Sequence, residues 1–147
     1  MELWELIARE RIRETIGRYA HCADGGRFDA LADLFIPDGV LEIPGQVITG
    51  RAAIRAFLGG TKSNLAATMS QPLIRHHVSS VSISILTPER AEAVSYFLAI
   101  TAAGPDHWGR YRDELVPTGE EWLFRRRRVR RDGYAPGSWI AARERHE

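Results

Sequence analysis

An aspartate and two adjacent histidines are the residues of this sequence best suited to acid–base chemistry. Asp24 lies where the first helical segment runs into two glycines, and His76 and His77 open the first long strand-like segment. An imidazole that a carboxylate orients and charges can take a proton from carbon. Asp24 together with one of these histidines therefore predicts proton transfer. Taken alone, Asp24 could be a solvated turn residue, and a single histidine could be structural.

Only one of the two histidines can face the interior, because neighbouring residues of a strand point to opposite sides of a sheet. Strict alternation with the apolar residues Val81 and Ile83 selects His77. A β-bulge around residues 79–80 would instead select His76. The spacing alone leaves both histidines open.

Further polar candidates lie in both halves of the sequence. Tyr19 falls on the apolar face of the first helix, which favours a core side chain over a phenol in a pocket. His107, Tyr111 and Asp113 share parity on one predicted strand and can face the same side, where Asp113 is as easily an ion-pair partner. Cys22 is interpreted as a small core residue, since no nucleophile motif surrounds it.

The motifs of several enzyme classes are absent from the sequence. It has no metal-ligand spacing, no G-x-S-x-G elbow, no phosphate-binding loop and no dinucleotide fingerprint. We therefore expect neither a metal nor a cofactor.

The basic residues are almost all arginine, nineteen against the single Lys62, with a run of six arginines between residues 125 and 131. An alternating strand splits this run between two faces, and the net charge of +1 supplies no wider basic field. Nucleic-acid binding is therefore not expected. We expect Arg131 to line a ligand site and other arginines to bridge subunits.

The pattern of the chain predicts an α+β domain with helices first and an antiparallel meander second. We expect helices over residues 3–23, 28–35 and from 50 to the glycines at 59–60, a hairpin over 40–43 and 47–48, and strands over 74–85, 91–101, 107–116 and 121–131. We expect a cone-shaped, curved antiparallel or mixed sheet that packs on the long N-terminal helix and two shorter helices. Such a fold forms a cup, and small ligands typically bind in the opening of a cup of this kind.

The length of 147 residues fits one domain, which we place at residues 1–134, followed by a C-terminal tail at 135–147. The single cysteine, Cys22, excludes an intrachain disulfide and fits a reducing compartment. No apolar run is long enough for a membrane span, and the N-terminus does not resemble a signal peptide. A cytoplasmic protein without membrane contact is expected.

Several stretches of the sequence resemble SnoaL-like proteins of the nuclear transport factor 2-like superfamily. The similar segments are RYAHCADGGRFD (18–29), LFIPDGV (34–40), GRAAI (50–54), GRYRD (109–113) and EW (121–122). The resemblance runs from about residue 4 to residue 131, and it is more specific for the fold than for the reaction.

Within that superfamily the chain most resembles the dehydratase branch, which includes scytalone dehydratase, bile-acid 7α-dehydratase and a hexachlorocyclohexane dehydrochlorinase. Asp24 takes the place of the family aspartate, and an ungapped placement puts the family histidine on His76. Tyr19 matches a tyrosine of the bile-acid enzyme. The resemblance thus implies Asp24, His76 and Tyr19 as catalytic residues. From the strand pattern we expect His77, Tyr111 and Arg131 as substrate contacts.

The implied reaction is a cofactor-free elimination on a small apolar cyclic substrate that is aromatic, polyketide or steroid-like. The sequence departs from these enzymes at two positions, which limits how far their substrates can be assigned to this chain. Ile43 replaces a tyrosine of scytalone dehydratase, and Ala99 replaces an acid of the bile-acid enzyme. The base of ketosteroid isomerases also falls on Ile43, so steroid isomerisation is disfavoured.

Other functions stay open at this point. They are a non-catalytic ligand-binding cup, a structural protein similar to the β subunit of ring-hydroxylating dioxygenases, and a polyketide cyclase or isomerase. In each case a homo-oligomer, either a dimer or a trimer, is expected, because related dehydratases are trimers and the outer face of the sheet is suited to burial.

Overall fold

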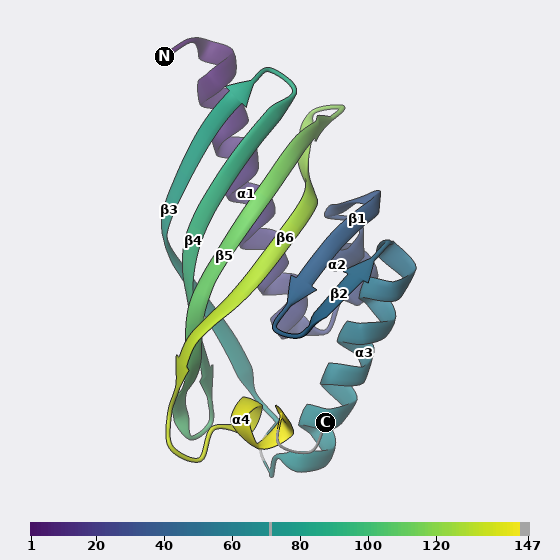
Figure 1. The fold of residues 1–147 in the computed structure, drawn as a ribbon, viewed down its shortest axis with the longest axis vertical. Helices are drawn as coiled ribbons and strands as arrows, with labels where there is room; N and C mark the ends of the chain where they lie inside the picture. Colours follow the sequence, from purple (N-terminus) through teal and green to yellow (C-terminus); the bar gives the residue numbers. More distant parts are fainter. Residues whose placement is uncertain (71, 145–147) are drawn as a thin grey trace.

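A curved six-stranded sheet packs against one long helix in this computed structural model, which describes residues 1–70 and 72–144 (Figure 1). The elements are α1 (Leu3–Gly25), α2 (Phe28–Ala32), β1 (Phe35–Ile43), β2 (Gln46–Thr49), α3 (Arg51–Thr68), β3 (Ile74–Thr87), β4 (Arg90–Thr101), β5 (Gly104–Thr118), β6 (Glu121–Tyr134) and α4 (Trp139–Glu144). The strand order is β2-β1-β6-β5-β4-β3. Strands β3 to β6 form the antiparallel meander, whereas β1 runs parallel to β6, so the predicted α+β fold with a curved mixed sheet is confirmed.

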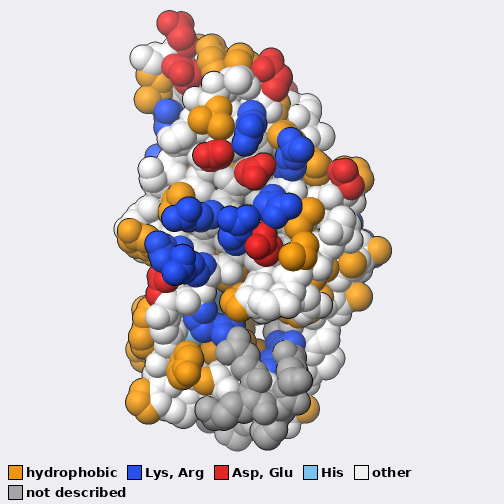
Figure 2. All heavy atoms as spheres, in the orientation of Figure 1, with side chains coloured by type: hydrophobic (Ala, Val, Ile, Leu, Met, Phe, Trp, Pro, Cys, Tyr) orange, Lys and Arg blue, Asp and Glu red, His pale blue; other side chains and the backbone are white. Residues whose placement is uncertain are grey.

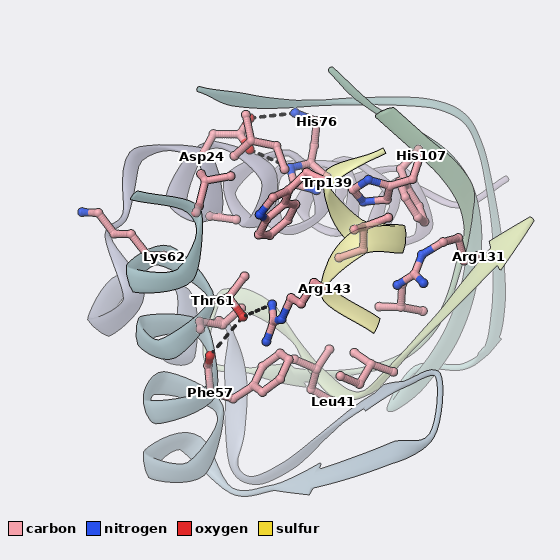
Figure 3. Close-up of a pocket in the computed structure, with 18 of the residues that line it drawn as sticks. Asp24, Leu41, Phe57, Thr61, Lys62, His76, His107, Arg131, Trp139 and Arg143 are labelled. Carbon is pink, nitrogen blue, oxygen red and sulfur yellow. Dashed lines mark hydrogen bonds and ion pairs between the residues drawn. The ribbon is translucent and has the colours of Figure 1, made fainter. Parts of the chain in front are cut away.

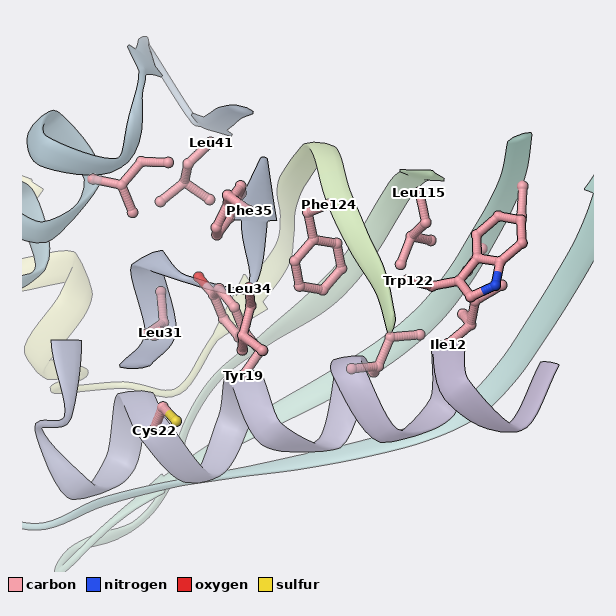
Figure 4. Close-up of a cluster of buried hydrophobic side chains, with 14 of the residues drawn as sticks. Ile12, Tyr19, Cys22, Leu31, Leu34, Phe35, Leu41, Leu115, Trp122 and Phe124 are labelled. Atoms are coloured by element: carbon pink, nitrogen blue, oxygen red, sulfur yellow. The ribbon is translucent and has the colours of Figure 1, made fainter. Parts of the chain in front are cut away.

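The core lies between α1 and the inner face of the sheet. Buried residues of α1 recur at helical spacing, as in Ala8, Ile12, Ile16 and Tyr19, because one stripe of the helix faces the strands. Figure 4 shows this cluster along α1, with Cys22 and Leu31 toward one end and Trp122 toward the other. The long N-terminal helix thus closes one half of the cup with apolar side chains.

Two predicted helix boundaries are wrong. The second helix ends at Ala32, and Phe35 already begins β1, because the Leu34 carbonyl accepts a hydrogen bond from the Phe124 amide at 2.8 Å. Helix α3 does not stop at residues 59–60 but continues to Thr68. Neither glycine there has the positive φ that would end a helix, and a regular helix tolerates the pair.

The C-terminal segment is more ordered than the sequence predicted. Residues 135–147 were expected to form a tail, yet α4 packs beside β5 and its buried Trp139 reaches α3. The Asp106 carboxylate accepts hydrogen bonds from the Trp139 amide at 2.7 Å and from Ser138 Oγ at 2.8 Å. Residues 145–147 lie outside the described part of the chain.

The arginine run of β6 is divided between the interior and the surface. Figure 2 shows the surface arginines interspersed with acidic side chains on the outer face of the sheet. Arg110 there pairs with Asp132, while Arg126 and Arg128 both pair with Glu42. Within residues 1–70 and 72–144, no helix has the length and apolar character needed to span a membrane.

Arg127 is the exception, because it lies fully buried with Asp113 on the neighbouring strand. Its Nε and Nη2 donate to the two carboxylate oxygens at 2.8 Å each, and neither side chain has any exposed area. The guanidinium carbon also lies 4.2 Å from the Tyr19 ring centroid, 3.9 Å from that of Tyr111 and 4.4 Å from that of Phe124. Aromatic faces and a bidentate carboxylate together stabilise this buried cation, although its Nη1 has no hydrogen-bond partner among the described residues.

This pair predicts a large and asymmetric effect on stability. Arg127→Met leaves the Asp113 carboxylate buried without its partner, and we expect it to lower the free energy of unfolding by about 3–5 kcal/mol in urea denaturation. The double variant Arg127→Met/Asp113→Leu should regain most of that loss. Arg110→Met, which breaks an exposed pair, should cost less than about 1 kcal/mol. Equal losses in Arg127→Met and Arg110→Met would contradict this account.

Candidate functional site

A cavity of about 550 Å³ opens between the lower end of the sheet, helix α3 and helix α4 (Figure 3). Its walls are mostly apolar, with Leu41, Phe57, Phe97 and Trp139 among the lining residues. A volume of this size suits a small cyclic molecule. The predicted cup therefore has an interior, and the polar side chains that face it define its chemistry.

Asp24 and His76 meet at the wall of this cavity. The His76 Nδ1 lies 2.6 Å from Asp24 Oδ1, and the His76 backbone amide donates to Asp24 Oδ2 at 2.9 Å. We assign the ring proton to Nδ1, since the carboxylate is the acceptor of both bonds. The other ring nitrogen, Nε2, is then left with a lone pair for a ligand.

A bulge in β3 decides which histidine faces inward. The pairing with β4 shifts register between Ser79 and Ser82, and Ser80 has a φ of 53°. Inward-facing residues are therefore even-numbered before the bulge and odd-numbered after it. Strict alternation, which selected His77, was wrong because it assumed an unbroken strand.

His77 lies on the exposed side of β3 and is not part of the cavity wall. The structure thus does not bring it to the other predicted site residues. The substrate contact expected of His77 does not fit this orientation.

Two buried phenols line the cavity beside the dyad formed by Asp24 and His76. Tyr19 comes from α1 and Tyr111 from β5, and their ring centroids are 6.0 Å apart. Burial raises the pKa of the Tyr19 phenol more than the nearby Arg127 lowers it, and burial likewise raises the pKa of Tyr111. Both phenols are therefore protonated hydrogen-bond donors at neutral pH.

Arg131, predicted as a substrate contact, lines the same cavity from β6. The resemblance also pointed to Ile43 as a departure, and this residue is part of the cavity wall as an apolar side chain. All of the predicted site residues except His77 are thus brought together.

A second carboxylate–histidine pair also belongs to the site, and its role was missed. His107 lines the cavity, and its Nδ1 lies 2.8 Å from Asp106 Oδ2. Its ring centroid is 6.3 Å from that of His76. The shared parity of residues 107, 111 and 113 was a signal for His107. Asp106 was not a candidate, because α4, which begins at its partner Trp139, was not predicted.

The protonation of this second pair follows from its burial. Burial lowers the pKa of His107, the charge of Arg131 and that of His76 when it is protonated lower it further, and Asp106 opposes them without reversing the direction. Burial by itself would raise the pKa of Asp106, but hydrogen bonds from His107, Trp139 and Ser138 outweigh it and lower that pKa. His107 is therefore a neutral imidazole at neutral pH, with Asp106 as its acceptor.

The arrangement can move a proton and stabilise a developing oxyanion. The His76 Nε2 is a base, and Tyr19 and Tyr111 are donors within an apolar enclosure. In the described part of the chain, no three His, Cys, Asp or Glu side chains are grouped so that they could hold a metal ion.

Comparisons with known proteins agree with this architecture. The family model of the SnoaL-like domain matches residues 4–128. A comparison with curated proteins returns no match.

Several solved structures are similar to the chain. One is a protein of Novosphingobium aromaticivorans provisionally named a scytalone dehydratase, at 26% identity and a TM-score of 0.78, covering 92% of this chain and 91% of that one. Another, from the same organism, is a nuclear transport factor 2-like protein with a cystatin-like fold, at 28% identity and a TM-score of 0.74, covering 94% and 88%. A third, from Catenulispora acidiphila, was solved in complex with S-DNPA, at 25% identity and a TM-score of 0.72, covering 95% and 97%. Since the family model spans most of the sequence and the fold agrees, the chain belongs to the SnoaL-like domain family.

Proposed function

We propose that this protein is a cofactor-independent lyase that eliminates water from a small, apolar cyclic β-hydroxyketone. The observation that carries the proposal is the 2.6 Å contact between Asp24 and His76 at the wall of an apolar cavity. A carboxylate in that position fixes the imidazole tautomer and stabilises the imidazolium that forms on proton abstraction.

The proposed reaction begins when His76 Nε2 takes the proton from the carbon between the carbonyl and the hydroxyl-bearing carbon. The electron pair of that C–H bond moves toward the carbonyl and gives an enolate, to whose oxygen Tyr19 donates a hydrogen bond. The enolate then re-forms the carbonyl and a carbon–carbon double bond as the C–O bond breaks. The His76 imidazolium returns its proton to the departing hydroxide, so that water leaves and the enzyme is restored.

The neutral His107 has a different part in this proposal. Its Nδ1–H is engaged by Asp106, so its Nε2 can accept a hydrogen bond from the substrate hydroxyl. Such a contact would orient the leaving group toward His76, whose ring lies at a centroid distance of 6.3 Å.

The similar proteins support the same class of chemistry. One of them bears the provisional name of a scytalone dehydratase, and another binds the small molecule S-DNPA. Polyketide cyclisation is the second candidate, in which Asp24 alone, acting as an acid at the wall of the same cavity, would assist an aldol ring closure without the histidine. Full activity without the histidine would favour an acid-assisted cyclase.

We also propose a homo-oligomer, a dimer or a trimer, in the cytoplasm. Tyr96 and Trp108 lie on the outer face of the sheet with 51% and 38% of their surface exposed. Large aromatic side chains at adjacent outer positions are typical of an interface. The buried free thiol of Cys22 fits a reducing compartment.

The dyad predicts the loss of elimination activity in specific variants. With 3-hydroxy-1-tetralone as the first of a panel of bicyclic β-hydroxyketones, elimination of water gives 1-naphthol, which is followed by fluorescence. Asp24→Asn and His76→Gln should each lower turnover by a factor of about 10²–10⁴, and Tyr19→Phe by about 10². His77→Gln is the matched control and should keep full activity. Unchanged turnover in Asp24→Asn and His76→Gln would refute the mechanism.

The lowered pKa of His107 predicts how stability depends on pH. The unfolded chain takes up this proton near pH 6.5, before the folded protein does, so stability is lost as the pH falls below about 6.5. His107→Asn should reduce this loss when urea unfolding is compared at pH 7.5, 6.5 and 5.5. Parallel pH profiles of the variant and the unaltered protein would contradict the assignment of His107 as a neutral imidazole.

The proposed oligomer predicts a mass of two or three chains in light scattering. A Tyr96→Glu/Trp108→Glu variant should reduce that mass to one chain, because both charges would be buried at the interface. Val47→Glu, at an exposed apolar position of β2, is the control and should not change the mass. A single-chain mass for the unaltered protein would rule out the proposal.

A further inference from the structure

The buried Arg127 guanidinium lies against both of the phenols that line the cavity. Its central carbon is 4.2 Å from the ring centroid of Tyr19 and 3.9 Å from that of Tyr111. The two tyrosines belong to the cavity wall, whereas Arg127 has no exposed area and does not line the cavity. The cation therefore lies behind the two phenols, on the side away from a bound ligand.

The positive end of the Arg127–Asp113 pair is the end that acts on the phenols. Asp113 accepts from Nε and Nη2 of Arg127, but the buried Nη1 has no hydrogen-bond partner among the described residues. Burial raises the pKa of Tyr19, and the Arg127 charge lowers it by more than the Asp113 charge raises it. Burial and then Tyr19 raise the pKa of Tyr111, where Arg127 again has a larger effect than Asp113. The pair is neutral as a whole, yet it favours negative charge at both phenols.

A cation in this position stabilises the transition state more than the bound substrate. A phenol that donates a hydrogen bond to an enolate takes on part of its negative charge, whereas a phenol beside a neutral ketone does not. Charges interact more strongly in a buried, apolar setting than in water. Because Asp113 already fixes the guanidinium, the cation needs no rearrangement when the charge develops.

We propose that Arg127 is a positioning residue of the reaction, which acts through Tyr19 and Tyr111 and makes both phenols stronger donors to the enolate oxygen. This inference rests on the proposed function, because the enolate is the intermediate of that reaction. Arg127 touches no substrate atom in this arrangement. Asp113 has the supporting part of holding the cation against the two rings.

The test measures the pKa of a bound enolate analogue, 4-nitro-1-naphthol, whose naphthol and naphtholate forms differ in visible absorption. The ligand cannot eliminate water, so the measurement is independent of turnover. Arg127→Met/Asp113→Leu, which removes the ion pair without leaving a buried charge, should raise the pKa of the bound naphthol by about 1, a tenfold loss of preference for the naphtholate. Arg127→Gln/Asp113→Asn, in which neutral amides replace the pair, should have the same effect.

Two controls separate the charge of Arg127 from its packing. Arg127→Lys keeps the charge and should keep the pKa of the bound naphthol within about 0.3 of its value in the unaltered protein, as should Arg110→Met on the protein surface. In a Tyr19→Phe background, Arg127→Met/Asp113→Leu should shift that pKa by less than about half as much, because one of the two phenols is gone. In the elimination assay the same double variant should lower kcat about tenfold and change KM by less than about twofold.

An unchanged pKa of the bound naphthol in a folded variant that lacks the ion pair would overturn the role of Arg127, and so would failure of the unaltered protein to bind the ligand. An undiminished shift in the Tyr19→Phe background would also overturn it, because the cation would then act on the ligand directly. A naphtholate preference that depends on Arg127, in a protein whose Asp24→Asn and His76→Gln variants keep full turnover, would uphold the role of the cation and remove the proposed elimination.

Discussion

The buried ion pair between Arg127 and Asp113 is the interaction that joins the packed half of the molecule to its hollow half. These residues are directly opposite in the pairing of β5 with β6, and both are sealed from solvent. The Arg127 guanidinium contacts the rings of Tyr19, Tyr111 and Phe124. The first two of these rings are cavity residues and the third belongs to the core, so one cation organises the boundary between the two.

A second constraint acts along β3, where one strand serves both halves. Its upper part faces the core with Ile83, and its lower part faces the cavity with His76. The extra residue at the bulge lets the strand bend and changes which residues point inward. A regular strand of the same sequence would turn His76 to the outside and leave Asp24 without its partner.

The sequence was sufficient for the fold class because the helical stripe of α1 and the alternating strands are strong local signals. Asp24, Tyr19, Tyr111 and Arg131 were also candidates, and all four line the cavity. The family resemblance selected His76 where alternation failed. The Asp106–His107 pair was missed because it depends on α4, a six-residue helix whose order comes from tertiary hydrogen bonds rather than from periodicity. The continuation of α3 past residues 59–60 was missed for a similar reason, since helical context outweighs the low propensity of glycine there.

The position of α4 makes the two ends of the chain unequal. The N-terminus lies at the far end of the molecule from the cavity, where α1 begins at Leu3, whereas α4 at the other end forms part of the cavity wall (Figure 1). An affinity tag or a fused domain placed before residue 3 would be remote from bound ligand. The same addition directly after α4 would be attached to the helix that carries Trp139 and Arg143. The choice of terminus for a tag or fusion would therefore affect the ligand cavity in any engineered form of this protein.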